Sequence, residues 1–214
     1  MILAAGLGTR LGDLGKSKPK VLINIKGKTL LERHLDLLEA QGIERVVINT
    51  HHLYKQINSF VQQYDGPLEI IVVREEELLG TAGAVYHALP VLGPDPFIVI
   101  YGDTYIQPFK IWQLNGATTI AVHKADDSEG MGVVEIDQYD RVTNFVEKGT
   151  TGPALVNSGI YVLNHEIVDL LLETGDFGYD VFPQAIKEGI KIYAHVIPPV
   201  IDIGTPERLS FARW

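Results

Sequence analysis

Apolar runs and helical patterns alternate through the first half of the chain. Short runs rich in β-branched residues cover Ile2–Ala4, Arg45–Asn49, Leu68–Val73 and Phe97–Tyr101. Apolar residues at helical spacing fill Thr29–Gln41 and Leu53–Gln63, and another helix is expected to begin near Gly80 and Thr81. Strand, helix and strand in this order form the unit from which parallel sheets are built. The first half therefore predicts a largely parallel α/β sheet.

The helix expected after Thr29 carries the clearest local signals. Thr29 and Glu32, three residues apart, form the pattern of a capping box at the start of a helix. The apolar face of this helix is made by Leu31, Leu35 and Leu38. Gly42 follows the last apolar position and is typical of a helix end. These signals together predict an amphipathic helix that packs one face on the sheet.

The second half has less helix between its strands. Strand patterns cover Thr118–His123, Val133–Ile136, Val142–Glu147 and Leu155–Leu163. Their closeness along the chain favours antiparallel or mixed pairing. Later elements are expected as helices at Glu166–Glu173 and Asp180–Glu188, a strand at Lys191–Ile197 and a last helix from Pro206. No repeat, low-complexity tract or shift in composition marks a linker, so residues 1–214 are expected to form one domain.

The composition narrows the partners and the chemistry. With 18 Lys and Arg against 27 Asp and Glu, the formal charge of -9 disfavours a broad surface for nucleic acid or for an anionic membrane. The absence of cysteine excludes disulfides, thiolate catalysis and cysteine-bound metal centres. The chain has no apolar run of bilayer length and no secretory signal, so we expect a cytoplasmic protein. A monomer and a homodimer both fit these properties.

A glycine-rich loop follows the first strand directly and occupies a phosphate-binding position. Its residues run Leu3-Ala4-Ala5-Gly6-Leu7-Gly8-Thr9-Arg10-Leu11. Glycines at the carboxyl end of a parallel strand let backbone N–H groups approach a triphosphate closely. Arg10 adds a planar guanidinium suited to two phosphate oxygens, and Lys20 adds a second positive charge. A glycine-rich turn without a ligand is the simpler alternative, but the adjoining Thr-Arg pair and the downstream lysine favour a phosphate site.

Two common phosphate motifs do not fit this loop. The dinucleotide-binding fingerprint needs a third glycine where Leu11 stands. The P-loop of ATPases ends in Gly-Lys-Ser, which Gly15-Lys16-Ser17 provides, but its other glycine would have to stand at Arg10. The spacing therefore excludes both motifs.

Several ordered motifs together resemble the sugar-1-phosphate nucleotidyltransferase family. The family signature Gly-x-Gly-Thr-Arg-Leu followed by Pro-Lys is matched by 6–11 and 19–20. The likeness continues through 79–84, 102–104, 132–135, 147–148, 157–161 and 202–206, and so spans nearly the whole chain. Within the family, the chain is most similar to short guanylyltransferases that act on manno-heptose 1-phosphate or mannose 1-phosphate. The resemblance implies a three-layer Rossmann-like α/β nucleotidyltransferase fold with a mixed, mostly parallel central sheet.

The resemblance also implies the reaction and its metal ion. Such enzymes transfer a nucleoside monophosphate from an NTP to a sugar 1-phosphate and release pyrophosphate. Because both reactants are anions, catalysis is mostly positioning and charge neutralisation, for which Mg²⁺ on carboxylates is well suited. By resemblance, Asp103 and Asp202 would hold this ion, although each alone could be an ordinary turn or cap aspartate. Arg10 would hold the β- and γ-phosphates, and Lys20 would lie near the α-phosphate.

The remaining expected contacts divide between the nucleotide and the sugar. The N-terminal half is expected to bind mainly the nucleotide, with contacts from Leu3, Ala4, Ala5, Gly6, Gly8, Thr9, Glu75, Gly80, Thr81 and Gly102. The C-terminal half is expected to bind mainly the sugar 1-phosphate, with contacts from Gly132, Glu147, Lys148 and Asn157. By resemblance, Lys148 would bind the sugar phosphate and act as a catalytic residue with Arg10 and Lys20. Met131 stands where many relatives carry tyrosine, which leaves the sugar open.

The acidic run Glu75-Glu76-Glu77 bears on the choice of base. A carboxylate can accept hydrogen bonds from N1–H and N2–H of guanine together, whereas uracil presents a single donor. An acidic residue in the base pocket therefore favours GTP over UTP. A run of three glutamates is also typical of solvated surface.

Other functions remain open at this point. A uridylyltransferase acting on a sugar such as N-acetylmuramate 1-phosphate, a cytidylyltransferase and a non-catalytic regulatory homologue are the alternatives. An NAD-dependent dehydrogenase is disfavoured by the missing third glycine. No chemistry is assigned to His51 and His52, since adjacent side chains in an extended segment face opposite ways.

Overall fold

The computed structural model describes residues 1–111, 117–149 and 151–213. The chain forms two compact units. Unit 1 contains residues 1–78, 100–108 and 200–214, and unit 2 contains residues 79–99 and 109–199. Both ends of the chain therefore belong to unit 1.

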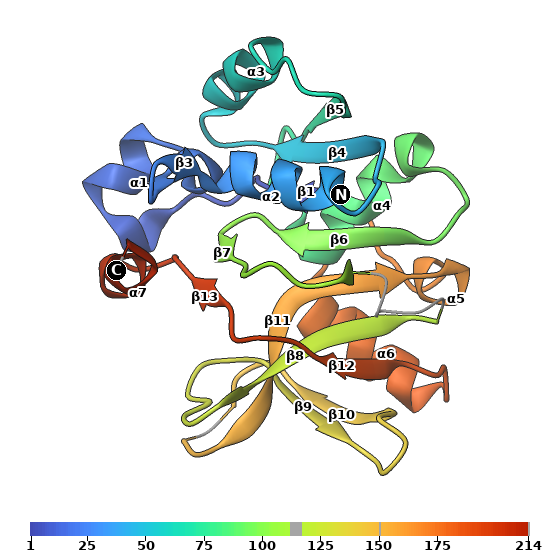
Figure 1. Ribbon diagram of the computed structural model, residues 1–214. Coiled ribbons are helices and arrows are strands. Elements are labelled where there is room, and N and C mark those ends of the chain that lie inside the picture. The colour runs from blue at the N-terminus through green and yellow to red at the C-terminus, as the bar shows by residue number, and fades with distance from the viewer. Residues whose placement is uncertain (112–116, 150, 214) are drawn as a thin grey trace. The chain divides into compact units, whose positions relative to one another are not determined.

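Unit 1 is built on parallel strand pairs (Figure 1). Its strands are β1 (Ile2–Leu3), β4 (Arg45–Thr50), β5 (Glu69–Arg74) and the end of β6 (Phe97–Tyr101). β1 pairs in parallel with β4 on one side and with β6 on the other, and β4 pairs in parallel with β5. The parallel sheet predicted for the first half is confirmed. Parallel strands end at one edge, so the segments that follow β1, β4 and β6 emerge there together.

The helix α2 (Leu30–Glu39) begins and ends as the sequence predicts. Glu32 N–H donates to Thr29 Oγ1 (3.2 Å), and the Glu32 carboxylate accepts from Thr29 N–H (2.6 Å), which completes the capping box. Gly42 has φ of 77°, and Ile43 N–H donates to Leu38 O (3.1 Å), which closes the helix end. The next helix, α3 (Tyr54–Gln62), lies within the range expected for it.

Several short elements of unit 1 were not predicted, because they are too short to show a periodic pattern of apolar residues. These are η1 (Thr9–Leu11), α1 (Asp13–Ser17), η2 (Lys20–Leu22), the hairpin of β2 (Asn24–Ile25) and β3 (Lys28–Thr29), β7 (Thr104–Tyr105) and β13 (Ile201–Asp202). The last helix, α7 (Pro206–Arg213), begins at the predicted proline. One apolar cluster joins these distant segments through Leu11, Ile23, Ile25, Leu30, Ile203 and Leu209. This cluster holds the first loop, the hairpin and the C-terminal segment together.

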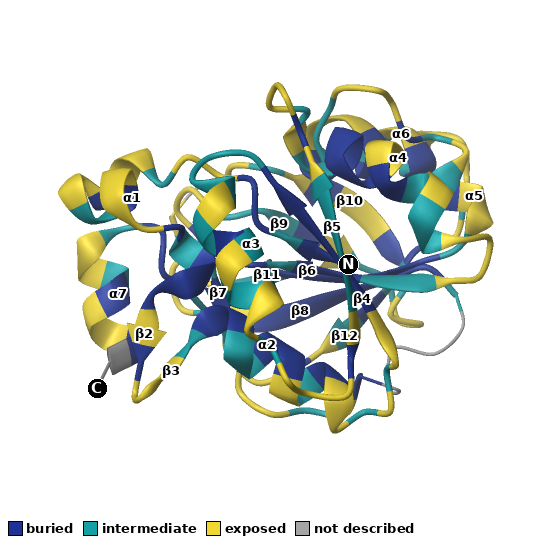
Figure 2. Ribbon diagram, turned by 90° about the horizontal axis from the view of Figure 1, so that it is seen from above, coloured by how far each residue is buried: buried dark blue, intermediate teal, exposed yellow. Residues whose placement is uncertain are grey.

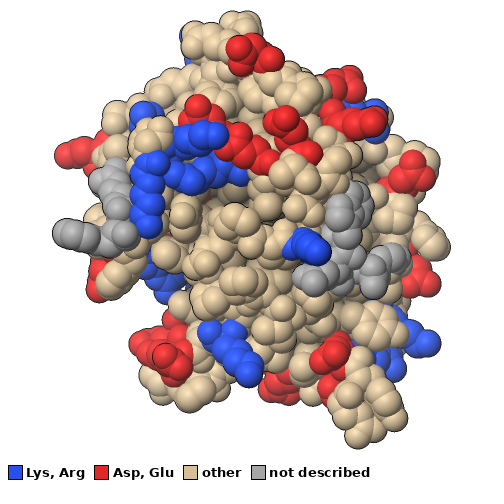
Figure 3. All heavy atoms as spheres, viewed as in Figure 1, with Lys and Arg blue, Asp and Glu red and all other residues tan. Residues whose placement is uncertain are grey.

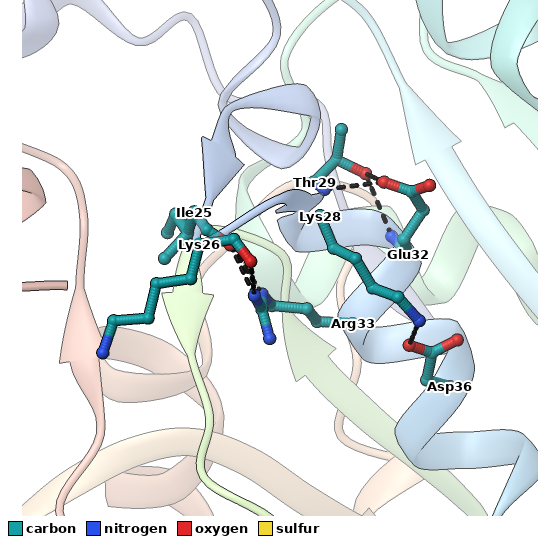
Figure 4. A network of polar contacts seen from close by, with 7 residues as sticks. All are labelled: Ile25, Lys26, Lys28, Thr29, Glu32, Arg33 and Asp36. Atoms are coloured by element: carbon teal, nitrogen blue, oxygen red, sulfur yellow. Dashed lines mark hydrogen bonds and ion pairs between the residues drawn. The ribbon is translucent and has the colours of Figure 1, made fainter. Parts of the chain in front are cut away.

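Polar contacts fix the hairpin on α2 (Figure 4). The Arg33 guanidinium donates to the carbonyls of Ile25 and Lys26, and Lys28 forms an ion pair with Asp36. Two hairpin residues, Lys26 and Gly27, have positive φ angles of 49° and 89°, as a tight two-residue turn requires. Arg33 therefore ties the hairpin turn to α2.

Unit 2 contains mixed strand pairs and the remaining helices. Its elements are α4 (Gly80–Leu92), β8 (Thr119–Ala125), β9 (Val133–Ile136), β10 (Val142–Val146), β11 (Ala154–Leu163), α5 (His165–Val168), η4 (Phe177–Val181), α6 (Phe182–Lys187) and β12 (Tyr193–Val196). β10 pairs antiparallel with β9, and β11 pairs antiparallel with both β9 and β8, whereas β12 joins β8 in parallel. The mixed sheet predicted for the second half is confirmed, as are α4 from Gly80 and the strands β9 and β11.

The helix predicted at Glu166–Glu173 is wrong in its extent, since α5 ends at Val168. After it, the N–H groups of Leu170 and Leu171 bond to carbonyls three residues earlier, and the chain then leaves helical geometry. The Gly175 carbonyl accepts hydrogen bonds from Ala82 N–H (2.9 Å) and Gly83 N–H (3.1 Å) at the start of α4. Satisfying these helix N–H groups overrides the local helical pattern.

The core of unit 2 is rich in aromatic side chains. Phe145, Tyr161, Phe177 and Phe182 form ring pairs with centroids 5.0 to 5.4 Å apart. Figure 2 shows that strands such as β8 are largely buried, while helices such as α2 carry a buried and an exposed side. Among the described residues, no helix has the length and apolar content to cross a membrane.

Candidate active site

The first loop is held in a compact conformation by glycines and by neighbouring side chains. Gly8 has a left-handed backbone with φ of 68°, which glycine adopts at little cost. Gly15 packs so closely that a Cβ there would lie 2.1 Å from the Gly8 carbonyl oxygen. His52 and Gln56 donate to the carbonyls of Gly15 (3.1 Å) and Ser17 (2.9 Å). The loop and the helix α1 that follows are thus tied to the start of α3.

The residues predicted to contact the nucleotide differ in exposure along this loop. Ala4 and Ala5 are buried, whereas Gly6 and Thr9 are exposed. Gly102 N–H donates to the Leu3 carbonyl (2.9 Å), and a Cβ on Gly102 would lie 2.5 Å from that oxygen. Gly102 therefore permits a close approach of two backbone segments at the edge of the parallel sheet, and the exposed backbone is that of the Gly6–Thr9 stretch.

Lys20 extends along the first loop and reaches Asp103. A Cβ on Gly6 would lie 3.4 Å from Lys20 Cε, so the lysine side chain runs beside the loop backbone. Its Nζ forms an ion pair with Asp103 Oδ2, and the two side chains are 16% and 23% exposed. The structure thus brings the predicted lysine, the predicted carboxylate and the glycine-rich loop together.

Asp202 binds two arginines at the second strand of the β7–β13 pair. Arg208 Nη1 lies 3.1 Å and Arg10 Nη2 lies 3.9 Å from Asp202 Oδ2, and Gly204 N–H donates to Oδ1 (2.7 Å). A Cβ on Gly204 would lie 2.6 Å from Arg10 Nη2. Glycine at this position therefore makes room for the guanidinium beside the carboxylate. The Arg10 side chain is 63% exposed, so it keeps access to solvent and to ligands.

A strand pair places the backbones of the two predicted metal ligands side by side. Asp202 pairs with Thr104 in the antiparallel register, and Ile203 N–H donates to the Asp103 carbonyl (2.9 Å). Neighbouring strands lie about 4.8 Å apart, and Asp103 directly precedes β7, so the backbones of the two aspartates are neighbours. Residues nearly a hundred positions apart in the sequence therefore meet here.

The donor set of this pair suits a hard cation. Among the described residues, no group of three or more His, Cys, Asp and Glu side chains could hold a metal ion. Two carboxylates with phosphate oxygens and water are nevertheless the usual ligands of Mg²⁺ at phosphate-transferring sites. Asp103 and Asp202 therefore supply the type of oxygen ligand that a magnesium ion would require. Both carboxylates pair with cationic side chains, so a metal ion would compete with Lys20, Arg10 and Arg208 for them.

Glu75 differs from the two glutamates that follow it. Glu76 and Glu77 are exposed, as expected for solvated surface, but Glu75 is only 2% exposed. Asn49 Nδ2 donates to Glu75 Oε1 (2.6 Å), and Asn49 Oδ1 accepts from Ala4 N–H (2.8 Å). Asn49 thus links the Glu75 carboxylate to the first loop within unit 1.

The backbone of Glu75 is held at both of its polar groups. Its N–H donates to the Thr50 carbonyl (2.8 Å), and its carbonyl accepts from His51 Nδ1 (3.0 Å). His51 and His52 bond to carbonyls of different segments, Glu75 and Gly15. The two histidines therefore serve local structure and do not form a joint site.

The Gly80-Thr81 turn belongs to unit 2, where it starts α4. Gly80 has φ of 77°, and a Cβ there would lie 2.4 Å from the Gly175 carbonyl oxygen. Thr81 donates both its N–H and its hydroxyl to Asp176 Oδ1, each at 3.0 Å. Asp176 therefore caps the helix and occupies the donors of Thr81. A ligand at this turn would contact the backbone around Gly80, which is exposed.

The predicted sugar contacts cluster in unit 2. Asn157 N–H donates to the Gly132 carbonyl (2.8 Å), and a Cβ on Gly132 would lie 3.3 Å from Asn157 Cβ. The Asn157 amide donates to the Tyr161 hydroxyl (2.7 Å) and accepts from Gly159 N–H (2.9 Å), which fixes its orientation. Phe145 touches the same space, since a Cβ on Gly132 would also lie 3.1 Å from its Cζ.

Glu147 lies against Gly178, where any side chain would collide with its carboxylate. Burial raises the pKa of Glu147, the negative charge of Asp176 raises it further, and Lys148 opposes the shift. Lys148 is exposed. A half-buried carboxylate beside an exposed lysine can accept hydrogen bonds from hydroxyl groups while the lysine receives an anion.

Sequence reasoning missed three residues that hold the predicted ones. Asn49 ends an apolar strand run with a polar side chain, which is a usable signal for a site at that edge. Arg208 lies six residues after Asp202, but no sequence pattern marks their ion pair. Asp176 gives no signal because its contact with Thr81 joins segments 95 residues apart, which meet only in the tertiary fold.

The surface in the view of Figure 3 carries both signs of charge. Lys and Arg side chains gather over the region of β3 and α2, and acidic side chains lie directly beside them. Such mixing suits small charged ligands bound in local sites better than an extended polyanion on this face.

Comparison with known proteins identifies the family, and its relatives include guanylyltransferases as well as a UTP--glucose-1-phosphate uridylyltransferase of Synechocystis, which is 30% identical over 222 residues and covers 91% of this chain and 56% of that protein. The family model described as nucleotidyl transferase matches residues 1–213. The chain is 31% identical over 210 residues to D-glycero-alpha-D-manno-heptose 1-phosphate guanylyltransferase of Campylobacter jejuni, covering 97% of this chain and 95% of that protein. It is 32% identical over 221 residues to probable mannose-1-phosphate guanylyltransferase 1 of rice, Oryza sativa, covering 96% of this chain but only 61% of the rice protein.

A solved structure is similar to this chain over nearly its whole length. HddC from Yersinia pseudotuberculosis superposes with a TM-score of 0.83 and 32% identity over 99% of this chain and 96% of that chain. The same protein has been solved in complex with GMP-PN, with a TM-score of 0.82. The mixed, mostly parallel α/β fold expected from the sequence is thus confirmed for the chain.

Proposed function

We propose that this chain, which belongs to the nucleotidyl transferase family, transfers a nucleoside monophosphate from GTP to a sugar 1-phosphate of the manno-heptose or mannose type. The products are a GDP-sugar and pyrophosphate. The observation that carries the proposal is the arrangement in unit 1, where the backbones of Asp103 and Asp202 lie side by side. Their carboxylates pair with Lys20 and Arg10, respectively.

The proposed reaction is an in-line displacement at phosphorus. A phosphate oxygen of the sugar 1-phosphate forms a new bond to the α-phosphorus of GTP. The bond from that phosphorus to the oxygen bridging the α- and β-phosphates breaks, and the electron pair leaves with pyrophosphate. No covalent intermediate with the protein is needed, so the protein acts by positioning and by charge.

Each basic residue has a proposed place in this reaction. Arg10 binds the β- and γ-phosphates and stabilises the departing pyrophosphate, since its exposed guanidinium can form two parallel hydrogen bonds. Lys20 runs beside the loop and stabilises the charge that grows on the α-phosphate. Mg²⁺, when bound to Asp103 and Asp202, supplies positive charge that offsets repulsion between the two anionic reactants. Lys148 binds the phosphate of the sugar 1-phosphate.

The nucleotide and the sugar are assigned mainly to different units. Unit 1 carries the first loop, Glu75 and Gly102, which we assign to the nucleotide. Gly132, Glu147 and Asn157 of unit 2 are assigned to the sugar hydroxyls. Glu75 supports guanine, because uracil offers one donor where guanine offers two, and a desolvated carboxylate oxygen left without its hydrogen bond costs about 1–3 kcal/mol. We further propose that the enzyme acts in the cytoplasm.

A pyrophosphate-release assay tests this proposal. The protein is incubated with Mg²⁺, each of the four NTPs and a panel of sugar 1-phosphates. The expected result is release of pyrophosphate that depends on both substrates and is fastest with GTP and a manno-configured sugar. Preference for UTP would instead support a uridylyltransferase, and no pyrophosphate from any pair would support a regulatory protein.

Two variants link the assay to the site. Arg10→Ala is expected to lower kcat about 100-fold, because one preorganised donor to developing charge is lost. Arg45→Ala is the matched control, since Arg45 is an exposed arginine at the start of β4. Equal activities of the two variants would contradict the role of Arg10.

A further inference from the structure

One histidine lies fully buried inside unit 1 among apolar residues. His34 is only 1% exposed and stands on the buried face of α2, between Leu30 and Leu38 in the helical repeat. A polar ring in such a position is destabilising unless its hydrogen bonds are satisfied. Its presence there therefore requires a specific contact.

His34 makes that contact with one ring nitrogen. Nε2 lies 2.8 Å from the Thr104 carbonyl oxygen, which can only accept, so Nε2 carries the proton. Within the described residues, Nδ1 is buried without a hydrogen-bond partner. Burial lowers the pKa of the ring to about 4, which keeps it neutral. An apolar residue of similar size would avoid the unsatisfied nitrogen, so stability of the core alone does not explain the histidine.

Thr104 is the residue that adjoins both predicted metal ligands. It follows Asp103 in the chain and pairs with Asp202 across the β7–β13 strands. The strand pair has only two residues in each strand, so few hydrogen bonds hold it. A bond from α2 to the Thr104 carbonyl therefore restrains both aspartates at once.

Arg33, which precedes His34 on α2, makes a second contact with β7. Arg33 lies with its guanidinium 5.5 Å from the centre of the Tyr105 ring, the other residue of β7. Arg33 is itself fixed by the carbonyls of the hairpin turn (Figure 4). Consecutive residues of α2 thus contact consecutive residues of β7.

We propose that His34 is a positioning residue that sets the spacing of Asp103 and Asp202 for a divalent cation through its hydrogen bond to the Thr104 carbonyl. This inference rests on the proposed function. Mg²⁺ demands oxygen ligands near 2.1 Å in an octahedron and tolerates displaced ligands poorly. Residues that orient metal ligands from behind typically change metal affinity about 10- to 100-fold when removed.

The test measures metal binding without turnover. Mn²⁺ is titrated by electron paramagnetic resonance into the protein saturated with a non-hydrolysable GTP analogue, with the analogue alone as background. His34→Leu removes the donor while keeping apolar volume and is expected to weaken Mn²⁺ binding about 10-fold. His34→Gln retains an amide N–H and is expected to bind nearly as the wild type. The Mg²⁺ concentration for half-maximal pyrophosphate release should shift in parallel.

A control separates positioning from general loss of stability. Leu38→Ala opens a cavity on the same buried face of α2, one turn beyond His34, and leaves the His34 bond to Thr104 in place. It should lower Tm and leave Mn²⁺ affinity unchanged. If His34→Leu does not fold, His34→Asn replaces it, since its amide is too short to reach Thr104. Unchanged Mn²⁺ affinity in the donor-less variant, or equal weakening in Leu38→Ala, would overturn the proposal. Failure of the wild type to release pyrophosphate would instead reject the proposed function, and the Mn²⁺ titration would still decide the role of His34.

Discussion

At the residue scale, the side chain of Asn49 connects two parts of the proposed nucleotide site. It accepts from Ala4 N–H and donates to the Glu75 carboxylate, and these groups are buried. Asn49→Leu would leave both without these bonds, at about 1–3 kcal/mol for each buried group. We expect the ratio of kcat/KM for GTP over UTP to fall about 10-fold as Glu75 loses its fixed position. Steady-state kinetics with both nucleotides measure this ratio, and Glu76→Gln, at an exposed site, serves as the control. An unchanged ratio would show that Asn49 does not support base selection.

The pKa of His34 gives a prediction for stability at the same scale. The ring has its ordinary pKa near 6.5 when unfolded and about 4 when folded, so the unfolded chain binds the extra proton between these values. The free energy of unfolding should therefore fall as the pH drops from about 6.5 towards 4, and this contribution should be complete above 6.5. His34→Gln cannot take up this proton, so urea unfolding at pH 7.5 and pH 4.5 should show a smaller loss for the variant than for the wild type. Equal losses would mean that His34 does not titrate as its burial requires.

Glu147 makes the free energy of unfolding depend on pH in the opposite direction to His34. Its pKa is raised in the folded protein by burial and by Asp176, so the folded state holds its proton more tightly than the unfolded state. The free energy of unfolding should then fall as the pH rises through the ordinary pKa of a glutamate and up to the raised value. Glu147→Gln removes this loss, and its Tm should exceed that of the wild type at pH 7.5 but not at pH 4. In the same variant the KM for the sugar 1-phosphate should rise, because a hydroxyl acceptor of full charge is lost.

At the element scale, the segment after β13 leaves room for Arg10, a side chain that we propose takes part in catalysis. Gly204 leaves room for Arg10, and a Cβ there would also lie 2.8 Å from Asp202 Oδ1. Gly204→Ala is expected to displace the guanidinium and lower kcat about 10-fold, with a smaller effect on Tm. Gly27→Ala is the control, because it strains a left-handed turn in open space away from the carboxylates and should lower Tm alone. If both variants lowered kcat equally, Arg10 would not depend on the space at Gly204.

The elements also show which features the sequence could predict. α2 and α7 start where Thr29 and Pro206 predict, because caps and prolines act on their own helices. The longer strands of the sheet could also be predicted, because each one coincides with an apolar run in its own sequence. β7 and β13 could not be predicted, because two-residue strands have no period and exist only through their pairing. α5 was predicted too long because the carbonyl of Gly175 is needed at the start of α4.

At the scale of the whole molecule, residues that lie far apart in the sequence come together in the proposed site. Residues 1–20, 102–103 and 202–208 meet in unit 1, so N-terminal and C-terminal segments together build the proposed carboxylate and phosphate site. The motifs named Arg10, Lys20, Asp103 and Asp202 without showing how they meet. The structure added the Arg208 contact with Asp202, which no sequence pattern marks, and the bonds of Asn49 to Ala4 and Glu75, which depend on tertiary packing.

Hydrogen exchange tests whether the nucleotide binds unit 1 and the sugar 1-phosphate binds unit 2. A non-hydrolysable GTP analogue with Mg²⁺ should slow amide exchange at residues 3–10, 100–103 and 200–204, because these segments of unit 1 surround the proposed phosphate and metal contacts. At about 100 times its Kd, a ligand adds roughly 2.7 kcal/mol, which corresponds to about 100-fold slower exchange where opening excludes the ligand. Mannose 1-phosphate or manno-heptose 1-phosphate should slow exchange at residues 131–133, 147–148 and 155–159 of unit 2. The Arg10→Ala variant should lose the first pattern and keep the second, whereas protection by the GTP analogue confined to residues 119–196 would contradict the assignment of the nucleotide to unit 1.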